Sequence, residues 1–129
     1  MRQPLIEYRK IGLLATVIGN ERIRVDSDGG LYYSRNSHAH KAGELWSESW
    51  QKVGRLDAVA VSDLLRAIRG SGVLALPPVT VDEAVEGGKR EELLLLIDQS
   101  LQHYVVQNSD QPAFRKAVQL LWGALAGVV

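Results

Sequence analysis

The sequence predicts an α+β fold, in which an antiparallel sheet of four or more strands carries two helices on one face. Alternating apolar and polar residues within 22–34 and 91–107 predict two hairpins. Apolar residues spaced three and four apart over 58–69 and 112–125 predict two helices. The order along the chain is β-β-(β)-α-β-β-α, and hairpins joined by single helices are typical of this class.

A meander of two or three antiparallel strands, which contains the first hairpin, is predicted from residues 13–35. The apolar segment 13–18 reads as a strand, and in 22–26 Ile23 and Val25 share one face while the charged residues face water. Asp28-Gly29 supplies the positive φ angles of a tight turn, after which 31–34 returns as the next strand.

The segment that follows contains a polar loop and a third strand. Residues 36–44 are small and polar, which is typical of an exposed loop. A strand over 45–53 would place Trp46, Glu48, Trp50 and Lys52 on one face of the sheet.

The first helix has a clear beginning and end. Asp57 can cap its first turn, and glycines at 70 and 72 are suited to its end. The core residues expected in this helix are Val61, Leu64, Leu65 and Ile68. Residues 79–90, which follow Pro77-Pro78, are mostly acidic and predict a mobile loop.

The second hairpin and the last helix complete the fold. The apolar run 93–97 predicts that the strand 91–97 is covered on both faces, or very nearly so. In the strand 102–107, Tyr104 and Val106 share a face. Pro112 suits the first turn of a helix that frays from Gly123 or Gly127. The apolar stripe of this helix is Phe114, Val118, Leu121, Trp122 and Leu125.

Length and composition restrict the function. With 129 residues the chain is expected to form a single domain, residues 1–129. Fifteen basic and fifteen acidic residues give no net charge, which argues against a nucleic-acid partner. The absence of cysteine excludes thiol chemistry. No apolar stretch is long enough for a membrane span, so we expect no membrane partner and a cytoplasmic protein.

Motifs for catalysis and cofactor binding are missing. The chain has no phosphate-binding glycine-lysine loop, no dinucleotide fingerprint and no nucleophile elbow, so we predict no catalytic residue and no cofactor. His38-Ala39-His40 is a metal-like pattern, but two ligands make a weak zinc site and two exposed loop histidines explain it better. Glu91-Glu92 and Asp82-Glu83 are not expected to form catalytic carboxylate pairs, because neighbouring strand residues point to opposite faces. They predict a solvated acidic rim instead.

The aromatic residues are the candidates for partner contact. Tyr32, Tyr33, Trp46 and Trp50 could form a recognition surface, since tyrosine and tryptophan are enriched in binding hot spots. Packing on a sheet face explains them equally well, and Trp122 is expected in the core.

Residues 64–77, LLRAIRGSGVLALP, resemble the helix and its x-Gly-Phe-Phe-x-Leu-Pro exit in the protealysin-inhibitor (emfourin) family, with Val73-Leu74 where the family favours aromatic residues. The loop, the two strands and the Pro-led helix at Pro112 follow in a similar order, and a glycine hairpin at Asp28-Gly29-Gly30 precedes them. The resemblance covers about residues 22–125. It implies a small bacterial inhibitor of thermolysin-like metalloproteases, and it assigns no inhibitory residue in this chain.

The function predicted from these features is a small non-catalytic protein-binding module, with a protease-inhibitor-like domain as its narrower form. The partner is then another protein, a metalloprotease in the narrower form. One alternative is a metal-binding protein or metal-assisted enzyme using His38 and His40. Another is a structural subunit that self-associates through the tryptophan-bearing strand.

Overall fold

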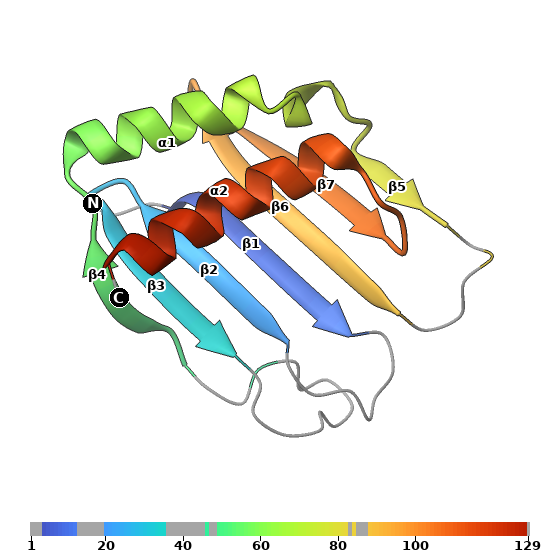
Figure 1. The fold of residues 1–129 in the computed structure, drawn as a ribbon, viewed down its shortest axis with the longest axis horizontal. Coiled ribbons are helices and arrows are strands. Elements are labelled where there is room, and N and C mark those ends of the chain that lie inside the picture. The colour runs from blue at the N-terminus through green and yellow to red at the C-terminus, as the bar shows by residue number, and fades with distance from the viewer. Residues whose placement is uncertain are drawn as a thin grey trace.

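A computed structural model describes residues 4–12, 20–35, 46, 49–82, 84 and 88–128 of the chain. These residues form one sheet and two helices, as the α+β prediction requires (Figure 1). The strands are β1 Pro4–Gly12, β2 Glu21–Asp26, β3 Gly30–Arg35, β4 Gln51–Arg55, β5 Val79–Val81, β6 Lys89–Ile97 and β7 Ser100–Gln107. The helices are α1 Ala58–Gly70 and α2 Pro112–Val128, with a short 3-10 turn at Val73–Ala75.

The sheet has seven strands in the order β4-β3-β2-β1-β6-β7-β5. All neighbours are antiparallel except β5 and β7, which run parallel. The seven strands agree with the predicted four or more, whereas the parallel pairing of β5 with β7 departs from the predicted antiparallel arrangement. Both helices lie on the same face of this sheet, as predicted (Figure 1).

Two strands were not predicted. β1 carries three charged residues, and it was not assigned to any element even though Ile6 and Tyr8 alternate with Glu7 and Arg9. β5 and the first residues of β6 lie in the stretch 79–90, which was predicted to be a loop. The expected strand over 13–18 and the loop 36–44 lie outside the described residues.

The third predicted strand is shorter and later than expected. Residues 46, 49 and 50 are not in a strand, and β4 begins at Gln51. A register shift between Leu31 and Tyr32 in the β3–β4 pairing lets β4 continue to Arg55. The last helix continues through Gly123 and Gly127 to Val128.

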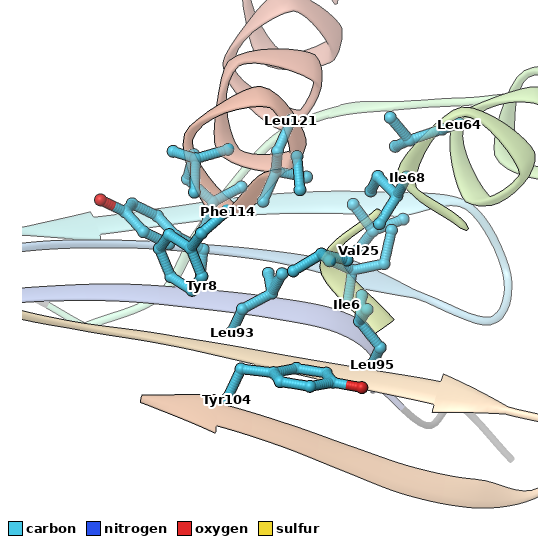
Figure 2. Packing of buried hydrophobic residues seen from close by; sticks show 14 of the residues in the cluster. Ile6, Tyr8, Val25, Leu64, Ile68, Leu93, Leu95, Tyr104, Phe114 and Leu121 are labelled. Atoms are coloured by element: carbon cyan, nitrogen blue, oxygen red, sulfur yellow. The ribbon is translucent and has the colours of Figure 1, made fainter. Parts of the chain in front are cut away.

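The core lies between the sheet and the two helices. Figure 2 shows Leu121 and Phe114 of α2 near Tyr8 and Leu93 of the sheet, with Leu64 and Ile68 coming from α1. Six of the nine predicted helix core residues are buried, whereas Leu65, Trp122 and Leu125 are only partly buried. Trp122 packs against the core, with its ring 6.4 Å from that of Tyr8.

Local hydrogen bonds explain where α1 begins and how the first hairpin turns. The Asp57 side chain accepts a hydrogen bond of 2.8 Å from the Ala60 amide, which satisfies one of the unpaired donors of the first turn. In the β2–β3 hairpin, the Gly29 amide donates to the Asp26 carbonyl at 2.9 Å. Gly29 has φ +87°, and an added Cβ would lie 2.0 Å from the Leu56 carbonyl oxygen, so glycine is required there.

Candidate protein-binding surface

The face of the sheet opposite the helices, called the open face below, carries the candidate surface. Side chains alternate along each strand, and directly paired residues of neighbouring strands share a face. Arg9 pairs with Arg22, which pairs with Ser34, and these three residues form one row across β1, β2 and β3. The next row contains Glu7, Arg24, Tyr32 and Lys52.

Two tryptophans lie over the first of these rows. The Arg22 guanidinium carbon is 4.6 Å from the ring centroid of Trp46 and 4.3 Å from that of Trp50. Both distances are within the range of a cation–π contact, which is worth about 0.5–1 kcal/mol at an exposed site and more when desolvated. The two rings therefore hold the guanidinium of Arg22 in place on the sheet.

A second arginine connects these aromatic residues. Arg24 lies 5.6 Å from the Tyr32 ring centroid and 5.9 Å from that of Trp50. Its guanidinium also donates to both carboxylate oxygens of Asp26, at 2.6 and 3.2 Å. Below, the name arginine–tryptophan corner is used for Arg22, Arg24, Tyr32, Trp46 and Trp50.

The two arginines of the corner differ in their electrostatic environment. The hydrogen bond to Asp26 raises the pKa of Arg24 above its usual value. Burial lowers the pKa of Arg22, and the neighbouring Arg9 and Arg24 add to this effect while Glu7 opposes it. Among the described residues, the Arg22 Nε has no hydrogen-bond partner although it is buried. Arg22 is therefore a partly desolvated cation that the described part of the chain does not neutralise.

The other half of the open face is more apolar. His103 and Glu92 form a pair at 2.9 Å on β7 and β6. Around them, Leu101 is 62 % exposed, Val79 59 % and Val81 39 %. A shallow hollow of about 180 Å³ lies between β1 and the β6–β7 hairpin, lined in part by Leu5, Glu7, Leu94 and Leu101.

Two larger hollows lie away from the open face. One of about 700 Å³ lies between the β2–β3 turn and the beginning of α1, near Gly29, Leu56 and Val61. The other, of about 690 Å³, lies beside the beginning of α2 and includes Glu91. Glu91 accepts a hydrogen bond of 2.6 Å from the Tyr8 hydroxyl and pairs with Lys89 at 3.3 Å, so its carboxylate is already bound within the protein.

The structure brings three of the four predicted contact residues together. Tyr32, Trp46 and Trp50 lie at the arginine–tryptophan corner, although residues 46 and 50 are not in the strand from which their common face was predicted. Tyr33 faces the helices instead, and its ring lies 6.3 Å from that of Trp122. Tyr32 and Tyr33 therefore cannot contribute to one surface, because adjacent strand residues point to opposite faces.

The remaining candidates fall into two groups. His38, His40 and Glu83 lie outside the described residues. Glu91 and Glu92 point to opposite faces, as expected, since Glu91 binds Tyr8 on the helix side and Glu92 binds His103 on the open face. Among the described residues, no group of three metal-ligating side chains could hold an ion.

Sequence reasoning did not identify Arg22 and Arg24 as part of a surface. The alternation within 22–26 placed both arginines on one face, but it assigned them only to water. The alternation does not reveal the strand order, which puts β2 between β1 and β3 and brings residues 46 and 50 over Arg22.

Comparisons with known proteins add no identification. No protein-family model matches the chain, and no sequence among the curated proteins matches it. The resemblance to the protealysin-inhibitor family therefore stays an expectation. Within the described part of the chain, no helix combines the length and the apolar character needed to cross a membrane.

Proposed function

We propose that the protein is a protein-binding module that docks its partner on the open face of the sheet. The observation that supports this most directly is the arginine–tryptophan corner. It gathers arginine, tyrosine and tryptophan, the residue types most enriched in binding hot spots, on the face that the two helices leave uncovered.

The apolar side chains of β5 and β7 support the same proposal. Leu101, Val79 and Val81 are three of the four most exposed large hydrophobic residues in the described part of the chain, and all three lie on the open face. The fourth, Val59, lies on α1. A face that combines exposed apolar residues with a polar, aromatic corner has the composition of a protein interface.

The test is to capture partners from the native cell and to map their contact with single variants. Trp50→Ala should weaken capture at least about ten-fold, the effect of removing a hot-spot residue. Val59→Ala is the control, because it removes an exposed apolar side chain from the helix side. Partners that bind equally well to both variants would contradict docking at the corner.

A narrower form of the proposal, supported by the family resemblance, is inhibition of a thermolysin-like metalloprotease. Titration of the domain against such a protease, with peptide hydrolysis as the readout, tests it directly. Inhibition that Trp50→Ala relieves would support this form. Unchanged hydrolysis with the domain in excess would exclude it and leave protein binding in its general form.

A further inference from the structure

We propose that the arginine–tryptophan corner binds an acidic segment of a partner protein, with Arg22 receiving a carboxylate and Lys52 acting as a second cation. This inference rests on the proposed function, since it specifies the chemistry of the partner. Its basis is the pairing of charges on the open face, the like-charged neighbours of Arg22, and the way the tryptophans hold its guanidinium.

The first argument concerns charges that lack a partner. Each carboxylate of the described open face already has an arginine on the same strand. These pairs are Glu7 with Arg9, Asp26 with Arg24, and Glu92 with Arg90. Arg22 and Lys52 have no ion pair with any described residue, so a surplus of positive charge remains where β2, β3 and β4 meet.

The second argument concerns like charges. Arg9 and Arg22 are directly opposite each other on β1 and β2, and cross-strand pairs of like charge are destabilising. Arg24, two residues along β2, adds to the positive potential at Arg22, and Glu7 offsets part of it. An anion at Arg22 would offset this repulsion, whereas a cationic partner would increase it.

The third argument concerns geometry. Trp46 and Trp50 contact the guanidinium within 4.6 Å, so the side chain is already positioned before a ligand arrives. A guanidinium stacked on aromatic rings can still donate from its edge, and its paired N–H groups match the two oxygens of a carboxylate. Because the Nε is buried, the terminal Nη groups are the donors that a ligand would meet.

An acidic peptide fits this surface better than a nucleic acid. Glu7, Asp26 and Glu92 lie between the arginines of the open face and pair with them, so this face has no continuous row of free cations to follow a phosphate backbone. The rings of Trp46 and Trp50 are engaged with Arg22, whereas single-stranded nucleic acids require aromatic rings for base stacking. The chain also has no net positive charge.

The experiment titrates the full chain with hexaglutamate, hexalysine and hexathymidylate and follows the Arg22 Nε–H resonance by NMR. Hexaglutamate should shift this resonance and bind more weakly as salt increases, because exposed charges are screened. Arg22→Ala should raise the dissociation constant, measured by calorimetry, at least about ten-fold, as expected for loss of a charge-assisted pair. Lys52→Ala, on an exposed edge-strand residue, should raise it about two- to five-fold.

Arg66→Ala is the matched control, because Arg66 is an exposed arginine of α1 paired with Asp63. It should leave hexaglutamate binding unchanged. Thermal unfolding of each variant establishes that it is folded, and Lys52→Ala still tests the inference if Arg22→Ala does not fold. Equal binding of hexaglutamate to the wild type, Arg22→Ala and Lys52→Ala, or tighter binding of hexathymidylate than of hexaglutamate, would overturn the inference. A natural partner that requires Trp50 while hexaglutamate does not bind would also overturn it, yet leave the proposed function standing.

Discussion

Replacing Leu121 with alanine tests the packing of α2 on the sheet. Leu121 has no exposed surface and lies in the core cluster with Phe114, Tyr8 and Leu93 (Figure 2). The change removes three carbon atoms, which amounts to about 2.4 kcal/mol of transfer free energy at about 0.8 kcal/mol each. Incomplete closure of the cavity adds to this loss, so the expected decrease in the free energy of unfolding is about 3–5 kcal/mol.

Leu65→Ala is the matched comparison for this prediction. Leu65 is only partly buried, and it lines hollows open to solvent beside α1. Its truncation removes the same atoms but leaves no closed cavity, so we expect a loss of about 1–2 kcal/mol, roughly half of the transfer term. Urea unfolding of the wild type and the two variants gives the midpoints, and the Leu121→Ala shift should be at least about twice the Leu65→Ala shift. Equal shifts, or a larger one for Leu65→Ala, would refute this account of the core.

Three further changes test a buried hydroxyl, a helix cap and the metal alternative. Burial and the Glu91 carboxylate raise the pKa of Tyr8. The stabilising effect of the protonated Tyr8 hydroxyl is therefore present below about pH 10 and is lost as the pH rises further. Tyr8→Phe should reduce the alkaline slope of the unfolding free energy by up to about 1.4 kcal/mol per pH unit, measured from pH 9 to 11.5. Asp57→Ala should cost about 0.5–2 kcal/mol in urea unfolding, whereas Asp57→Asn should retain most of the cap. Zinc should bind weakly in calorimetry; tight binding that disappears when His38 and His40 are both changed to alanine would favour the metal alternative instead.

The helices and the two hairpins could be predicted because their signals are local. Apolar spacing identified α1 and α2 nearly to their ends, and alternation placed Ile23, Val25, Tyr104 and Val106 on the covered face. β1 was missed because two of its three charged residues, Glu7 and Arg9, lie on the uncovered face of the sheet, so that the sequence of a central strand resembles a polar segment. β5 was missed because a strand of three residues between a proline pair and acidic residues has almost no pattern of its own.

The candidate surface was predictable only in part. Trp46 and Trp50 were grouped by an alternation expected of a strand over 45–53, yet β4 begins only at Gln51 and neither tryptophan lies in it. Finding Arg22 beneath them required the strand order, because residues distant in sequence become neighbours only through β2–β3 and β3–β4 pairing. Tyr33 was grouped with Tyr32 because both are aromatic, although strand geometry separates them.

The central position of β1 has a consequence for the order in which the sheet assembles. β1 pairs on one side with β2, which follows closely, and on the other with β6, as in the bond from Tyr8 to Glu91 across 83 residues. During synthesis, β1 to β4 leave the ribosome long before β6, so one edge of β1 has no strand to pair with. Pairings so distant in sequence slow folding and leave strand edges open to other chains. The interval between synthesis of β1 and closure by β6 is therefore when this protein is most exposed to misassembly, and when a chaperone would contribute most.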